Sequence, residues 1–93
     1  MNVTIIGTGN MGRGIATRLL SGGHGVTLID HDQSQATELA KQLQASAKGG
    51  ATVSTAAAGS KLKDEIIVLA VSYPVLLDVI KQYGKQFDGK IVG

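Results

Sequence analysis

Three glycines near the N-terminus form a pattern that is typical of phosphate binding. Residues 7 to 12 are Gly-Thr-Gly-Asn-Met-Gly, or G-x-G-x-x-G, and they follow the apolar run Val3–Ile6. In such a turn Gly7 permits the tight turn out of a strand, Gly9 lets a pyrophosphate approach the backbone, and Gly12 allows a helix to pack closely. The first N–H groups of that helix have no partner inside it, and the positive end of its dipole attracts an anion.

The glycine pattern alone is weak evidence, because a turn between a strand and a helix can be rich in glycine without binding a ligand. Asp30 strengthens it. This residue follows the apolar run Val26–Ile29, about 20 residues beyond the glycines, where an acidic side chain accepts hydrogen bonds from ribose hydroxyls and repels a 2′-phosphate. The alternative for Asp30 is a turn residue or a helix cap. For His31 the alternatives are a solvated loop residue and a ring stacked near an adenine.

These residues must be positioned by alternating strands and helices. The apolar runs predict strands at 3–6, 26–29, 51–55, 66–71 and 90–93, with helices at about 12–21, 33–48 and 74–83 and a brief helix within 56–62. Asp32 and Gln35 have the spacing of a capping box at the start of the second helix. Two sets of apolar residues are expected to face the sheet: Met11, Ile15, Ala16, Leu19 and Leu20 in the first helix, and Leu76, Val79, Ile80 and Tyr83 in the last.

This order of elements predicts an α/β protein with a Rossmann-type parallel sheet. Right-handed crossovers between parallel strands give the expected strand order 3-2-1-4-5. A ligand would bind at the carboxyl ends of the strands, between strands one and four, where the order reverses. Residues 1–93 are therefore interpreted as one NAD(P)-binding domain.

Composition excludes several other functions. The net charge is only +2 and no basic run is interleaved with aromatic residues, so nucleic acid is not an expected partner. Cysteine is absent, and His24 and His31 do not have the spacing of metal ligands, so no disulfide or metal site is predicted. No apolar run approaches the roughly 18 residues that span a membrane, and a cytoplasmic location is expected.

Four stretches give the chain a family resemblance: residues 5–12, 23–27, 66–71 and 89–92. The chain resembles the NADP oxidoreductase family that includes the deazaflavin-coenzyme-dependent reductases. It is similar more broadly to the N-terminal domains of pyrroline-carboxylate reductases and β-hydroxyacid dehydrogenases. The resemblance implies an NAD(P)-dependent oxidoreductase that transfers a hydride between a nicotinamide cofactor and a second cofactor or small substrate. It identifies no catalytic residue and no particular hydride acceptor.

The same resemblance assigns cofactor contacts along the chain. The pyrophosphate would lie on the turn, the adenosine ribose at the end of the second strand, and the nicotinamide half at the end of the fourth. The implied cofactor-binding residues are Gly7, Thr8, Gly9, Asn10, Met11, Gly12, Asp30, His31, Ala70, Val71 and Tyr73. NADP users of the family usually have a Ser-Arg pair where this chain has Asp30-His31, which favours NAD over NADP. Ser72 replaces a frequent proline near the nicotinamide.

Family members continue beyond the fifth strand into elements that complete the active site and often form a dimer. We therefore expect the chain to be the N-terminal part of a larger enzyme, truncated at or within that strand, with a possible homodimer formed through the missing region. Two alternatives have distinct consequences. A non-catalytic NAD(P)-sensing module would bind the dinucleotide without turnover, and a purely structural domain would bind none.

Overall fold

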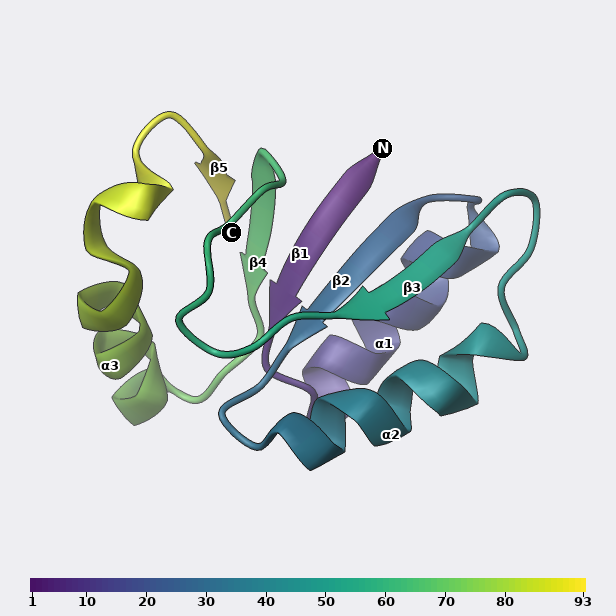
Figure 1. Ribbon diagram of the computed structural model, residues 1–93, viewed down its shortest axis with the longest axis horizontal. Helices are drawn as coiled ribbons and strands as arrows, with labels where there is room; N and C mark the ends of the chain where they lie inside the picture. The colour runs from purple at the N-terminus through teal and green to yellow at the C-terminus, as the bar shows by residue number, and fades with distance from the viewer.

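A single five-stranded sheet, in the order β3-β2-β1-β4-β5, organises residues 1–93, all of which the computed structural model describes (Figure 1). Every neighbouring pair of strands is parallel, which confirms the predicted sheet and strand order. The elements are β1 (Asn2–Ile6), α1 (Asn10–Ser21), β2 (Gly25–Ile29), α2 (Gln33–Gln44), β3 (Thr52–Thr55), β4 (Ile66–Leu69), α3 (Tyr73–Tyr83), the 3₁₀ helix η1 (Gly84–Phe87) and β5 (Ile91–Val92).

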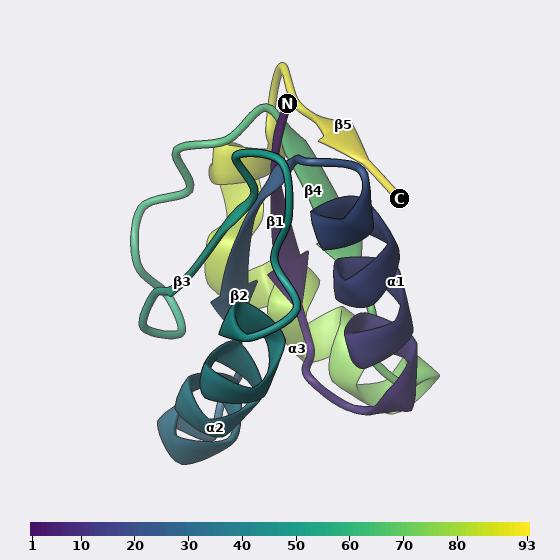
Figure 2. The ribbon, with the colours of Figure 1, turned by 90° about the vertical axis from the view of Figure 1, so that its right-hand side faces the viewer.

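Helices cover both faces of the sheet, with α1 and α2 on one face and α3 on the other (Figure 2). Side chains alternate between the faces along each strand, so neighbouring residues belong to different cores. Ile5 and Leu28 pack with α1 and α2, whereas Ile6 and Ile67 pack under α3. Ile5, Leu28 and Ile67 are completely buried. Burial of each such side chain contributes about 1.5–3 kcal/mol.

The buried stripe of α1 differs from the predicted one. Gly12, Ala16 and Leu20 are buried, while Met11 is 57% exposed. Ile15 and Leu19 are half-buried at the margin of the contact. The start of the helix lies close to the glycine turn at Gly12. The buried residues are therefore each one position later in the chain than the predicted Met11, Ile15 and Leu19.

The second helix is shorter than expected, ending at Gln44 rather than near Lys48. Asp32 caps it as predicted, because its Oδ1 accepts a hydrogen bond of 3.1 Å from the Ser34 N–H. The reciprocal half of a capping box is not made. The N–H of Asp32 donates instead to Oδ1 of Asp30, at 2.9 Å, so the start of α2 is attached to the end of β2.

The connection from β3 to β4, residues 56–65, contains no helix, so the brief helix predicted within 56–62 is wrong. We call this segment the β3–β4 loop. A tight turn forms in it, with the Ser60 N–H and Oγ both donating to the Ala57 carbonyl. Gly59 lies within this turn with φ +82°, a conformation that favours glycine. Helical geometry is lost at that position.

Helix α3 begins at Tyr73, one residue before the predicted start, and Pro74 lies in its first turn; it ends at Tyr83 as predicted. Val79 and Tyr83 face the sheet and are buried, and Leu76 is half-buried. The prediction for Ile80 is wrong, because this side chain is 45% exposed. None of the helices is both long and apolar enough to span a bilayer.

Candidate dinucleotide site

The turn after β1 lies where the strand order reverses. The Gly7 N–H donates to the carbonyl of Ile29 in β2, at 2.8 Å, while the Ala70 N–H donates to the carbonyl of Ile6, at 2.8 Å. Gly7 has φ +108°, and a Cβ there would collide with the carbonyl of Ala70. The fold itself therefore requires glycine at this position.

The other two glycines of the motif have different surroundings. A Cβ on Gly12 would collide with the carbonyl of Gly7, so its absence lets α1 start directly beneath the turn. Gly9 has φ −75°, and a Cβ there would meet no atom within 4 Å. Nothing in the folded chain requires glycine at position 9. The space beside it is open to a ligand.

The N-terminus of α1 opens at the same place. Gly9 is the N-cap residue, no side chain caps the helix, and the first turn carries no acidic residue. The first helical hydrogen bond runs from the Arg13 N–H to the Gly9 carbonyl, at 2.9 Å. The N–H groups of the turn before Arg13 are thus available to an anion, and the helix dipole favours negative charge there.

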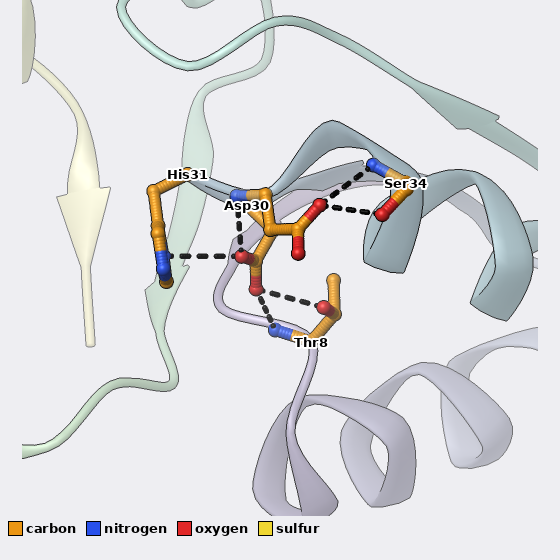
Figure 3. A network of polar contacts seen from close by, with 5 residues as sticks. Thr8, Asp30, His31 and Ser34 are labelled. Atoms are coloured by element: carbon orange, nitrogen blue, oxygen red, sulfur yellow. Dashed lines mark hydrogen bonds and ion pairs between the residues drawn. The ribbon is translucent and has the colours of Figure 1, made fainter.

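Asp30 is the central polar residue of the site (Figure 3). Its carboxylate is buried, with 7% of the residue exposed. Oδ2 accepts hydrogen bonds from both the N–H and the Oγ1 of Thr8, at 2.9 and 2.7 Å, and Oδ1 accepts the one from Asp32. Burial alone would raise the pKa of Asp30, but the hydrogen bonds from Asp32 and Thr8, with the charge of His31, outweigh it and lower that pKa below its ordinary value. Asp30 is therefore ionised at neutral pH.

His31 lies at the open side of this carboxylate. Its Nδ1 is 3.1 Å from Oδ1 of Asp30, and its side chain is 86% exposed (Figure 3). Each carboxylate oxygen has two lone-pair directions. Thr8 occupies both directions at Oδ2, so a further donor must approach at Oδ1 and displace the imidazole of His31.

A cleft of about 250 Å³ joins these residues at the carboxyl ends of β1, β2 and β4. It is lined by seven of the eleven sequence-predicted residues: Gly7, Thr8, Gly9, Asp30, His31, Ala70 and Val71. The remaining four lie outside its lining. Asn10 and Met11 are exposed at the start of α1, Gly12 is buried beneath the turn, and Tyr73 is 73% exposed at the start of α3.

The structure adds residues that the sequence did not indicate as site residues. They come from α2, the β3–β4 loop and α3: Gln35, Ala58, Val75, Val79, Gln82 and Tyr83. Ser72, which the family resemblance placed near the nicotinamide, also lines the cleft as the N-cap residue of α3. Val79 and Tyr83 were predicted to face inward, but as core residues. Ala58 and Gln82 carried no signal, because their role depends on how the β3–β4 loop passes α3.

This arrangement defines a Rossmann-type dinucleotide-binding domain: a parallel sheet in 3-2-1-4-5 order, a glycine turn leading to a helix N-terminus at the reversal, and an acidic residue after the second strand. Residues 2–92 match the family described as NADP oxidoreductase, coenzyme F420-dependent. The chain belongs to this family, whose cofactor is a nicotinamide dinucleotide.

Solved structures agree with this assignment. An imine reductase from Bacillus cereus aligns over 98% of this chain with a TM-score of 0.74 and 25% identity, and one from Streptomyces aurantiacus over 99% with 0.74 and 26%. A 3-hydroxyacyl-CoA dehydrogenase from Archaeoglobus fulgidus aligns over 88% with 0.59 and 29%. The chain spans 30% of the length of each of these proteins. A comparison with curated proteins finds no match.

Proposed function

We propose that the chain is the cofactor-binding domain of an NAD(P)-dependent oxidoreductase, which transfers a hydride between the nicotinamide and a second cofactor or small substrate. The observation that carries the proposal is the pair formed by Gly9 and the uncapped N-terminus of α1. The fold leaves open space at Gly9 and unpaired N–H groups beside it. A pyrophosphate fits both features, because it needs close approach to the backbone and donors for its charge.

The proposed contacts follow the cleft. Gly9, Asn10 and Met11 present backbone N–H groups to the pyrophosphate, and Gly7 and Gly12 shape the turn that aims them. The Thr8 N–H is already used by Asp30, so Thr8 acts by fixing the turn beside the pyrophosphate. Asp30 binds the adenosine ribose, with His31 moving aside. The hydride chemistry itself is supplied by the nicotinamide.

The nicotinamide half is proposed to lie along Ala70 and Val71, which line the cleft at the end of β4. Tyr73 would cover it from outside the cleft, since its side chain is exposed. We assign no catalytic acid or base within the chain. Because the chain spans only 30% of each imine reductase, we place the pocket for the hydride acceptor and any homodimer interface outside these residues.

We propose NAD as the preferred cofactor, although the family is described by NADP. The carboxylate of Asp30 is ionised and would repel a 2′-phosphate, whereas it can accept a hydrogen bond from a 2′-hydroxyl. The cleft is lined by no lysine or arginine, and His31 is its one potential cation. A 2′-phosphate would therefore find little compensating charge.

Calorimetric titration with NADH and NADPH tests these assignments. The wild-type protein is expected to bind NADH more tightly, Gly9→Ala to bind neither tightly, and Asp30→Asn to lose the preference for NADH. Gly14→Ala is the matched control, because a Cβ at this α1 position also meets no atom within 4 Å yet lies outside the cleft. Equal affinities in wild type and Gly9→Ala would contradict the site, and tighter binding of NADPH would contradict the NAD preference.

A second measurement separates an oxidoreductase from an NAD(P)-sensing module. Consumption of the bound reduced cofactor is followed by absorbance with two acceptors, a cyclic imine and an oxidised deazaflavin coenzyme, chosen from what the relatives and the family are named for. The assay uses the full-length protein, because the pocket for the acceptor is placed outside these residues. Turnover with either acceptor supports the oxidoreductase, whereas tight binding without turnover by the full-length protein would favour the sensing module.

A further inference from the structure

We propose that Gln82 recognises the adenine base of the dinucleotide, and that the β3–β4 loop holds the base against it. This inference rests on the proposed function, because it assumes that the cleft binds a dinucleotide. It concerns Ala58 and Gln82, two lining residues of the cleft that the cofactor contacts above leave unassigned.

The position of the base follows from the order of the cleft. With the pyrophosphate at Gly9 and the ribose at Asp30, the base must continue along the cleft past the end of β2. The β3–β4 loop runs from the end of β3 toward α3 (Figure 1). Ala58 of the loop and Gln82 of α3 both line the cleft, so they form the wall that faces the base.

Two hydrogen bonds attach the β3–β4 loop to the helices. The Gly59 N–H donates to the hydroxyl of Tyr83, at 2.8 Å, and the Leu62 N–H donates to Oε1 of Gln86, also at 2.8 Å. Tyr83 is 3% exposed and Leu62 is 5% exposed, and both belong to the core under α3. The wall is therefore formed before a ligand arrives.

The amide of Gln82 lies against this loop. A Cβ on Gly59 would be 3.0 Å from Nε2 of Gln82, so the amide packs across the backbone next to Ala58. The hydrogen bonds that attach the loop use Tyr83 and Gln86, and none uses the amide of Gln82. Gln82 is exposed and lines the cleft, so the donor and the acceptor of its amide remain available to a ligand beside the loop.

A side-chain amide has the chemistry to distinguish adenine from related bases. Its oxygen accepts from the N6 amino group while its NH₂ donates to the ring nitrogen N7. Hypoxanthine presents acceptors at both O6 and N7, so the amide oxygen has no donor on this edge and the pair of bonds is lost. Gln35 is the other glutamine of the cleft, but it also lines a separate depression with Thr8 and Arg13, toward α1.

The test measures the affinity for one dinucleotide, whichever of NADH and NADPH binds more tightly, and for its hypoxanthine analogue. The wild-type protein is expected to bind the adenine form roughly tenfold more tightly, the lower part of the range for a bidentate contact. Gln82→Met preserves the length of the side chain and removes both hydrogen-bonding groups, so its two affinities should become nearly equal. Gln35→Met and Gln44→Met should keep the wild-type ratio; Gln44 is exposed at the end of α2, outside the cleft.

The outcomes separate this inference from the proposed function. A wild-type ratio near one, or a ratio unchanged in Gln82→Met, would overturn the role of Gln82 while leaving dinucleotide binding intact. Loss of discrimination in Gln35→Met alone would do the same. Failure of the folded wild-type protein to bind either form would overturn both proposals.

Discussion

Thr8 donates two hydrogen bonds, from its N–H and its Oγ1, to the same carboxylate oxygen of Asp30. The two residues are 22 positions apart and belong to the ends of different strands. Through this contact the glycine turn and the end of β2 are held as one unit. Asp30 therefore orders the turn in addition to its proposed contact with the ribose, and a substitution at either residue should disturb both.

Removal of the Thr8 hydroxyl should lower stability at neutral pH. A hydrogen bond to a buried carboxylate contributes about 1.5–3 kcal/mol, so we expect Thr8→Val to lower the free energy of unfolding by about 2 kcal/mol. Urea denaturation at pH 7 measures this. Thr17→Val is the matched control, since the Thr17 hydroxyl donates to the Arg13 carbonyl on an exposed helix face, and the change there should stay within about 0.5 kcal/mol. Equal losses for the two variants would contradict the prediction.

The lowered pKa of Asp30 predicts a loss of stability in acid. A carboxyl group whose folded pKa lies below its unfolded value of 3.8 stabilises the fold fully above that value. This stabilisation is lost as the pH falls below 3.8 through the folded pKa. Asp30→Asn should be less stable than wild type at pH 7, and the difference should shrink across that acidic window. Urea midpoints measured from pH 7 down to pH 2 test this.

Asp32 is the control for the acid experiment. Its pKa is also lowered, chiefly by the hydrogen bond from the Ser34 hydroxyl, so it contributes acid sensitivity of the same sign. Asparagine is a good N-cap, and Asp32→Asn should keep α2 intact. We expect the variant that carries both Asp30→Asn and Asp32→Asn to lose less stability in acid than Asp30→Asn alone. An unchanged profile in Asp30→Asn would show that Asp30 does not link stability to pH.

The glycines of the turn should divide into two classes on substitution by alanine. Gly12→Ala should lower stability and cofactor affinity together, because the new methyl group collides with the Gly7 carbonyl. Gly9→Ala should change stability by less than about 0.5 kcal/mol while abolishing tight binding of the dinucleotide. Thermal denaturation and calorimetry on the same samples give both quantities. A marked loss of stability in Gly9→Ala would mean that the fold, rather than a ligand, selects that glycine.

Loss of the Tyr83 hydroxyl should loosen the β3–β4 loop without unfolding the protein. Tyr83→Phe keeps the ring in its core position and removes the bond to Gly59, so we expect a cost of about 1 kcal/mol. Amide hydrogen exchange should accelerate at Gly59 and stay unchanged in β1. Faster exchange throughout the sheet would instead indicate a global loss of stability.

The sequence was sufficient for the fold and for one wall of the site. Nearly continuous apolar strands separated by helices determine a parallel sheet, and the handedness of the crossovers then leaves few topologies. The glycine spacing and Asp30 located the turn and the end of β2 correctly. These features depend on short-range patterns, which a linear chain displays directly.

Tertiary contacts explain what the sequence did not reveal. Residues 56–62 have the composition of a short helix, but hydrogen bonds to Tyr83 and Gln86, which are 24 residues from their partners, stabilise a loop instead. Which residues of α1 are buried depends on how closely Gly12 approaches the turn. The spacing of apolar residues in the sequence does not predict this approach. Gln82 lines the cleft and lies beside Gly59, which is 23 residues earlier in the sequence. This proximity exists only in the folded chain.

The central place of β1 in the sheet has a consequence for synthesis on the ribosome. Its second neighbour is β4, so one edge of β1 stays unpaired until the chain has grown past Leu69. The cleft needs α3 as well, up to Tyr83. A nascent chain therefore has no complete cofactor site until nearly all of these residues have emerged. Binding of the cofactor would then show that β1 has paired with both β2 and β4.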